Sequence, residues 1–218
     1  MKALILVGGA VVATSALRGR TAGADLVVAA DGGLGHAAAL GLVPGLLVGD
    51  LDSVDAATRA RYPGLATEAH PIDKDELDLE LALDAAAVRG TTEALIVGGL
   101  SGRLDQTLAT VAIAQARRAD GMAVDVADGV RSVWPLGPGE TRRLPLAAGT
   151  RFSLLALDRS AVVSVAGARY PLERATLERA RGRGVSNEAL GAVVVTAHAG
   201  ALVVVDPGTD AELDAAGG

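Results

Sequence analysis

The first 128 residues alternate short aliphatic runs with longer Ala/Leu segments of helical period. This alternation is typical of βα units, in which a helix follows each strand and the strands run parallel. Strands are expected at residues 3–7, 25–30, 45–48, 66–70, 94–97 and 122–127. Helices are expected at residues 33–40, 55–61, 76–89 and 103–119. The pattern therefore predicts a mostly parallel, Rossmann-like sheet with helices packed against it.

The pattern changes after residue 128, where short apolar or alternating runs follow one another, broken by Pro and Gly. These runs predict strands at residues 130–136, 140–144, 152–157, 161–165, 192–197 and 201–205. Strands without long helices between them are typical of an antiparallel sandwich or barrel. We therefore expect two domains, an α/β domain at residues 1–128 and an all-β sandwich domain at residues 129–218.

Composition narrows the classes of function. Half of the 218 residues are hydrophobic, which is sufficient for a sizeable core. The net charge of −6 and the lack of a concentrated basic patch argue against a nucleic-acid surface. No apolar run has the length of a membrane span or the form of a secretory signal. We expect a soluble, cytoplasmic protein that binds neither nucleic acid nor a membrane.

Acidic and glycine-rich segments follow four of the expected parallel strands. They are Asp31-Gly32-Gly33, the pair Asp50 and Asp52, residues 73–78, and residues 98–105. Ligands of parallel sheets bind at the carboxyl ends of the strands, which is where these segments fall. Helix capping and turns explain each segment alone. They do not explain why the acids accumulate at one edge, where carboxylates repel one another unless a cation is present.

The type of ligand atom indicates which cation this edge would hold. Oxygen ligands without Cys or His favour Mg²⁺, which completes its shell with water and phosphate oxygens. Glycine-rich turns supply amide donors for phosphate, and Arg103 adds a planar fork for the same anion. A glycosidase acid pair would have no use for phosphate donors, and the P-loop signature is absent. The sequence therefore predicts a Mg²⁺-nucleotide site.

The backbone conformation of residues 50–52 determines in which direction the side chains of Asp50 and Asp52 point. In an extended segment, residues two apart point to the same side. We therefore expect Asp50 and Asp52 to face one cleft, while Leu51 turns back toward the core.

Five segments of the chain resemble the thiamine pyrophosphokinase family, in the order and spacing typical of that family. They are residues 30–33 (ADGG), 49–53 (GDLDS), 73–78 (DKDELD), 98–106 (GGLSGRLDQ) and 184–188 (GVSNE). The resemblance covers nearly the whole chain. It implies a Mg²⁺-dependent enzyme that transfers the terminal pyrophosphoryl group of ATP to the hydroxyl of thiamine, giving thiamine diphosphate and AMP. It also implies a nucleotide-binding α/β domain, a thiamine-binding β-sandwich, and a homodimer with its active sites between subunits.

The resemblance assigns roles to residues by their positions in these motifs. It implies that the catalytic and metal-binding carboxylates are Asp50, Asp52, Asp78 and Asp105. It implies that ATP is bound by Asp31, Gly32, Gly33, Lys74 and Arg103. It implies that the thiamine side of the site includes Gln106, Ser186 and Asn187.

Two further functions remain open from the sequence. Leu77 stands where the family commonly has a threonine, whose hydroxyl donates a hydrogen bond to phosphate. The C-terminal half is also poor in aromatic side chains for a thiazolium cation. One alternative is therefore a pyrophosphokinase for another hydroxymethyl heterocycle, such as a pterin. The other is a nucleotide-binding homologue without transfer activity, although such a protein has no physical reason to keep mutually repelling carboxylates.

Overall fold

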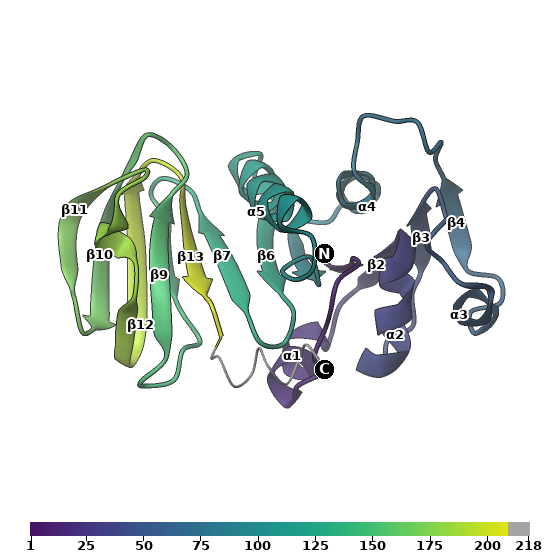
Figure 1. The fold of residues 1–218 in the computed structure, drawn as a ribbon, viewed down its shortest axis with the longest axis horizontal. Coiled ribbons are helices and arrows are strands. Elements are labelled where there is room, and N and C mark those ends of the chain that lie inside the picture. The colour runs from purple at the N-terminus through teal and green to yellow at the C-terminus, as the bar shows by residue number, and fades with distance from the viewer. Residues whose placement is uncertain (209–218) are drawn as a thin grey trace.

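A computed structural model describes residues 1–208, whose strands form one large mixed sheet that runs from β11 at one end to β4 at the other (Figure 1). Six neighbouring strands are parallel, in the order β6-β5-β1-β2-β3-β4. They are β1 (Lys2–Leu6), β2 (Leu26–Ala30), β3 (Leu46–Gly49), β4 (Ala66–Ala69), β5 (Glu93–Val97) and β6 (Ala123–Ala127). The chain adds β2, β3 and β4 on one side of β1 and β5 on the other. A reversal of strand order at this position opens a crevice at the carboxyl ends of β1 and β5.

Helices cover both faces of the parallel strands (Figure 1). Helices α4 (Asp78–Val88) and α5 (Leu104–Ala119) pack on one face. The other face is covered by α1 (Ser15–Thr21) and α2 (Gly35–Leu40), the latter preceded by the 3-10 turn η1 (Asp31–Leu34). The short helix α3 (Ala56–Ala60) follows β3. None of the helices in residues 1–208 is long and apolar enough to cross a membrane.

Helix α1 was not expected from the sequence. Thr14 caps it by accepting a hydrogen bond from the Leu17 amide, and only Leu17 and Thr21 of the helix are buried. Two arginines and a glycine interrupt the apolar period of this segment. The helix therefore depends on its cap and on one leucine contact, which a periodicity search does not detect.

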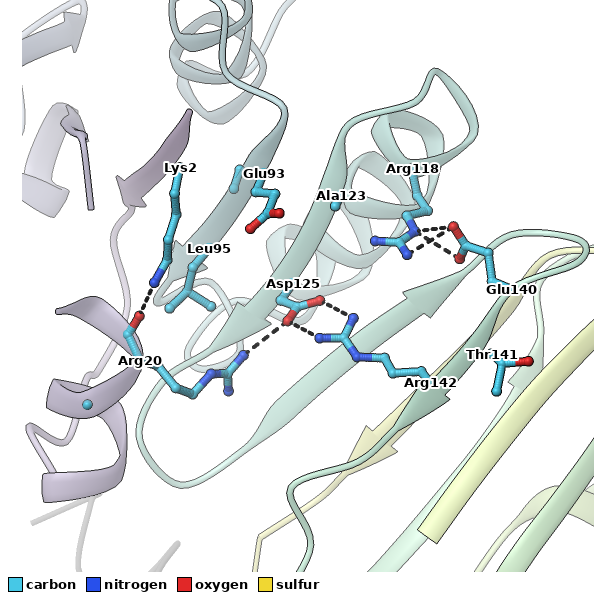
Figure 2. A pocket seen from close by; sticks show the side chains of 12 residues that line it. Lys2, Arg20, Glu93, Leu95, Arg118, Ala123, Asp125, Glu140, Thr141 and Arg142 are labelled. Carbon is cyan, nitrogen blue, oxygen red and sulfur yellow. Dashed lines mark hydrogen bonds and ion pairs between the residues drawn. The ribbon is translucent and has the colours of Figure 1, made fainter. Parts of the chain in front are cut away.

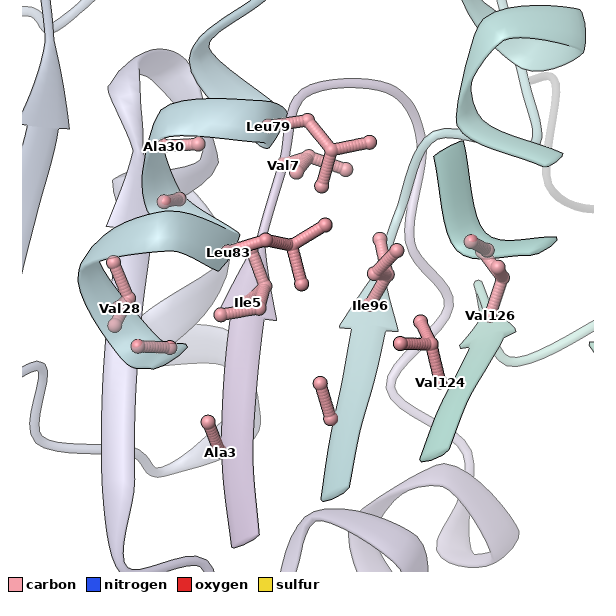
Figure 3. Packing of buried hydrophobic residues seen from close by; sticks show 14 of the residues in the cluster. Ala3, Ile5, Val7, Val28, Ala30, Leu79, Leu83, Ile96, Val124 and Val126 are labelled. Atoms are coloured by element: carbon pink, nitrogen blue, oxygen red, sulfur yellow. The ribbon is translucent and has the colours of Figure 1, made fainter. Parts of the chain in front are cut away.

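The core explains how the site is positioned. Leu79 and Leu83 of α4 pack onto Ile5 and Val7 at β1 (Figure 3). Leu4, which alternates with Ile5 along β1, faces the opposite cluster with α1 and α2. Full burial of a leucine such as Leu83 contributes about 1.5–3 kcal/mol. This packing fixes the N-terminus of α4 over the carboxyl ends of the parallel strands.

The remaining strands pair in antiparallel fashion, and β6 pairs with β7, so the sheet continues through residue 128. They are β7 (Ser132–Leu136), β8 (Thr141–Arg143), β9 (Arg151–Ala156), β10 (Ser160–Ala168), β11 (Leu172–Glu178), β12 (Asn187–Ala199) and β13 (Leu202–Asp206). A second 3-10 turn, η2 (Gly182–Gly184), precedes β12. Trp134 and Phe152 lie fully inside the core of this part. Strand β11 was not expected, because it lies at the edge of the sheet and most of its side chains are polar and exposed.

Candidate active site

Three carboxylates meet at the carboxyl ends of β2 and β3. Asp31 follows β2, Asp50 follows β3, and Asp78 is the first residue of α4. One oxygen from each lies within 4.8 Å of the others. Asp31 is only 8% exposed, and its Oδ1 is buried without a hydrogen-bond partner among residues 1–208. We call these three residues the carboxylate cluster.

The backbone at Gly49 allows the cluster to form. Gly49 has φ 138°, which L side chains rarely adopt. A Cβ atom built there would lie 3.1 Å from Oδ1 of Asp78 and 3.2 Å from Cβ of Asp31. Glycine therefore lets the ends of β2 and α4 approach each other across β3.

Lys74 supplies the positive charge at the cluster. Its Nζ lies 3.0 Å from Oδ1 of Asp78 and 3.6 Å from Oδ2 of Asp50, and the side chain is 12% exposed. Burial favours the neutral amine, but hydrogen bonds and charge from Asp78 and Asp50 outweigh it and raise the pKa of Lys74. The ammonium group therefore stays charged between two carboxylates.

The expected extended conformation of residues 50–52 is wrong. Leu51 has φ 70°, and the Asp52 amide donates a 3.1 Å hydrogen bond to Oδ1 of Asp50. That amide, with smaller contributions from Lys74, lowers the pKa of the Asp50 carboxyl. The turn leaves Asp52 exposed and outside the cluster, where its carboxylate accepts a 2.8 Å hydrogen bond from Ser53. Leu51 does pack toward the core, as expected.

The acids that cap helices are not the acids of the cluster. Asp55 caps α3 by accepting a hydrogen bond from the Thr58 amide. At α4, Glu80 accepts a hydrogen bond from the Leu77 amide, so capping does not account for Asp78. Helix capping therefore explains some of the acids at this edge but none of the three that meet.

A cavity of about 250 Å³ lies beside the cluster. It is lined by Val7, Gly8, Ala30, Asp31, Gly32, Ser53, Leu77, Asp78, Leu79, Gly99, Gln106 and Thr110. These residues come from the carboxyl ends of β1, β2, β3 and β5 and from the two helices above them. The cavity therefore lies at the crevice created by the reversal of strand order.

The loop after β1 is a part of this wall that the sequence reasoning missed. Gly8 lines the cavity, and Ser101 connects the neighbouring glycine-rich loop to the β1 loop by accepting a 2.6 Å hydrogen bond from the Ala10 amide. The signal was available, because Gly8 and Gly9 directly follow the first predicted strand.

Arg103 and Asp105 lie apart from the cluster. Arg103 donates hydrogen bonds of 2.6 and 3.2 Å to the Asp105 carboxylate. These bonds lower the pKa of Asp105 and raise that of Arg103. Both side chains are exposed, at 64% and 70%, so the arginine can exchange this partner for a ligand phosphate.

The donor set of the cluster fits Mg²⁺. All three side chains offer hard oxygen ligands, and Asp31 Oδ1 is a buried acceptor that no donor of the described residues satisfies. Such an atom is destabilising unless a cation or water meets it. Asp31, Asp50 and Asp78 are therefore the residues that would hold the ion.

Comparisons with solved structures identify the fold. Thiamine pyrophosphokinase from Bacillus subtilis aligns with a TM-score of 0.83 and 22% identity, covering 96% of this chain and 100% of that one. The enzyme from Geobacillus thermodenitrificans aligns with a TM-score of 0.80 and 24% identity, covering 96% and 98%. The Candida albicans enzyme aligns with a TM-score of 0.73 at 14% identity, covering 94% and 88%. No curated protein matches the chain.

A sequence comparison with family models gives one match. Residues 18–124 match the family described as thiamin pyrophosphokinase, catalytic domain. The match covers 107 of the 218 residues and supports an assignment to the thiamine pyrophosphokinase family. The matched stretch contains the whole carboxylate cluster, Lys74 and Gln106. The three acids that meet in space therefore all lie within the matched stretch.

Ser186 and Asn187 lie outside the matched stretch of the thiamine pyrophosphokinase domain, and neither lines the cavity beside the cluster. Asn187 is buried, and its side chain accepts hydrogen bonds from the Tyr170 and Glu188 amides and donates one to the Tyr170 carbonyl. Ser186 has φ 61°, and its amide donates to Oγ of Ser153. These bonds give Asn187 a structural role at the start of β12.

A second cavity of about 440 Å³ lies at the amino ends of β1, β5 and β6 (Figure 2). Its basic side chains are largely occupied by partners from the chain itself. Arg142 forms a bidentate pair with Asp125, and Arg20 approaches the same carboxylate at 3.5 Å. Arg118 pairs with Glu140 at 2.9 Å. These pairs join α1, α5 and β6 to β8 and the turn before it, so they connect the parallel and antiparallel parts of the sheet.

Proposed function

We propose that this chain transfers the pyrophosphoryl group of ATP to the hydroxyl of thiamine in the presence of Mg²⁺, giving thiamine diphosphate and AMP. The observation that carries the proposal is the carboxylate cluster of Asp31, Asp50 and Asp78. It lies beside a cavity at the carboxyl ends of parallel strands, within the stretch that matches the catalytic domain of the family. Transfer of a phosphoryl group depends mainly on alignment and charge neutralisation, and these residues are suited to both.

The three aspartates of the carboxylate cluster are the proposed metal ligands. Asp31, Asp50 and Asp78 would hold Mg²⁺, which when bound neutralises charge on the phosphates of the nucleotide. Asp31 thereby moves from the nucleotide group, where the motif placed it, to the metal-binding group. Neither Asp52 nor Asp105 contributes an oxygen to the cluster. Both remain predicted metal ligands only because of the family resemblance.

The nucleotide would bind over the glycine-rich turns. Gly32 lines the cavity, and Gly33 packs against the end of β1 so closely that a Cβ atom would lie 2.1 Å from the Leu6 carbonyl oxygen. Lys74 and Arg103 supply positive charge at the edge of the same region. We propose that these groups orient the polyphosphate of ATP so that the β-phosphorus faces the acceptor hydroxyl.

We propose that thiamine, the acceptor, binds at a site that two subunits of a homodimer form together. Gln106 lines the cavity in the same chain, whereas Ser186 and Asn187 do not. We propose that a second copy of the chain brings these two residues to the cavity. The division into a nucleotide-binding domain (1–128) and a thiamine-binding and dimerisation domain (129–218) remains part of this proposal, with residues 209–218 outside the described structure. A cytoplasmic location is likewise an expectation of the sequence.

A transfer assay tests the proposal. Purified protein is incubated with ATP, Mg²⁺ and thiamine, and AMP is followed over time. We expect AMP formation that requires thiamine and is lost in Asp50→Asn. Asp55→Asn is the matched control, because it makes the same change in the same loop and Asn also caps helices well.

The same assay separates the alternatives. If AMP forms with a pterin or another hydroxymethyl heterocycle but not with thiamine, that heterocycle is the acceptor in place of thiamine. Leu77 lines the cavity, so it is the residue to examine in that case. ATP binding without AMP formation from any alcohol would favour a nucleotide-binding homologue.

A further inference from the structure

Lysine is rare in this chain. Only two of the twenty basic residues are lysines, Lys2 and Lys74, and the rest are arginines. Lys2 donates a hydrogen bond to the Arg20 carbonyl at the far cavity. The only other lysine therefore stands at the carboxylate cluster.

The contacts of Lys74 suit a compact cation. An ammonium group is a compact point charge, whereas a guanidinium group is a planar fork. Nζ of Lys74 lies between Asp78 and Asp50 and also donates a 3.1 Å hydrogen bond to the Pro71 carbonyl. The ammonium group of Lys74 thus lies between the carboxylates of Asp50 and Asp78, where it offsets part of their negative charge.

The third carboxylate is not satisfied by this arrangement. Asp31 contributes an oxygen to the cluster, but among residues 1–208 no ion pair joins it to Lys74, and its buried Oδ1, like Oδ1 of Asp78, has no hydrogen-bond partner. One ammonium group therefore contacts two of the three carboxylates, and the cluster with Lys74 keeps a net charge of −2. This excess negative charge favours the binding of a divalent cation.

We propose that Lys74 is the resident counter-cation of the metal-free cluster and that an entering divalent cation displaces its ammonium group. The inference rests on the proposed function, because it takes the cluster to be a Mg²⁺ site. Lys74 is here a positioning residue that keeps Asp50 and Asp78 together before the metal binds. Once displaced, its charge is free for the phosphate of the nucleotide.

Metal titration tests the displacement directly. Mn²⁺ binding is measured by calorimetry or electron paramagnetic resonance on the wild type, Lys74→Met, Lys74→Arg and Lys2→Met. We expect Lys74→Met to bind Mn²⁺ about tenfold more tightly, because a competing positive charge has been removed from the site. It should also melt at a lower temperature than the wild type in a chelator. Lys2→Met should match the wild type, and Lys74→Arg should not show the tighter binding.

Amine labelling tests the same point on the unaltered protein, so it does not depend on how the variants fold. Acetic anhydride labelling of Lys74 is compared with and without Mg²⁺ by mass spectrometry, with Lys2 as the internal reference. We expect Mg²⁺ to increase the labelling of Lys74 several-fold relative to Lys2, since displacement exposes the amine and separates it from Asp78.

The outcomes separate this inference from the function on which it rests. Unchanged or weaker Mn²⁺ binding by Lys74→Met, or labelling of Lys74 that Mg²⁺ leaves unchanged, would overturn the displacement while leaving a metal-dependent transferase intact. If the wild type binds no Mn²⁺ at all, the Mg²⁺ requirement fails and the inference fails with it.

Discussion

A Cβ atom at Gly49 would lie 3.1 Å from Oδ1 of Asp78, closer than nine in ten real Cβ contacts. The Gly49→Ala variant should therefore push the carboxylate cluster apart and lose both Mn²⁺ binding and AMP formation. Gly64→Ala is the control, because Gly64 also has a positive φ of 79° but faces open space. That control should lose about 1 kcal/mol of stability through backbone strain while keeping its activity. Equal losses of activity in both variants would show that strain, and not crowding at Asp78, is responsible.

Asp31→Asn tests whether the buried oxygen of Asp31 is a metal ligand. The substitution keeps the shape of the side chain and removes one of the three charges of the cluster. We expect Mn²⁺ affinity to fall tenfold or more, because each carboxylate contributes a full charge to binding. Calorimetric titration gives the result. An affinity equal to that of the wild type would exclude Asp31 from the metal site.

Asp125 should matter for stability and not for catalysis. Its side chain is 19% exposed and holds Arg142 on β8 and Arg20 on α1 (Figure 2). In Asp125→Asn both arginines lose a charged partner, and we expect the free energy of unfolding to fall by about 2 kcal/mol. Urea denaturation measures this change, and AMP formation should be retained.

An exposed ion pair provides the comparison for Asp125. Glu68 pairs with Arg89 at 2.6 Å, and both side chains are about 40% exposed. Glu68→Gln should therefore lower stability by less than about 1 kcal/mol. If the two substitutions have equal effects, the pair at the second cavity does not connect the two parts of the sheet more strongly than a surface pair.

The cap of α3 should respond to acid. Hydrogen bonds from the side chain and the backbone of Thr58 lower the pKa of the Asp55 carboxyl. A lowered folded-state pKa gives stability that is present above the unfolded value of about 3.9 and is lost as the pH falls through the folded value. The wild type should therefore lose more stability than Asp55→Asn between pH 5 and pH 3 in urea denaturation. Parallel losses in the two proteins would contradict this assignment.

Much of the fold follows from the sequence because the buried parallel strands are largely apolar and have a glycine or an acid within two residues of their ends, whereas β4 is an exposed edge strand. All six parallel strands lie within a few residues of their expected positions. Helix α1 and strand β11 were missed because the first depends on a cap and a single leucine, and the second is an exposed edge strand with charged side chains.

The edge at which the acids gather was also predictable, but the identity of those that meet was not. Leu51 adopts φ 70°, so Asp50 and Asp52 separate where an extended strand would have aligned them. Asp31 joins the cluster because Gly49 leaves space beside it, which is a tertiary relationship that no local spacing reveals. The sequence motifs therefore predict the region of the site, whereas the backbone conformation determines which of its acids lie close together.

We propose that Asp31, Asp50 and Asp78 together form the metal site. Anomalous scattering from a crystal grown with Mn²⁺ and a non-hydrolysable ATP analogue locates the metal. We predict a Mn²⁺ peak within coordination distance of at least two of these three carboxylates, with the analogue's phosphates beside it. A peak bound by Asp52 and Asp105 without them, or an analogue bound with no Mn²⁺ at the cluster, would contradict the claim.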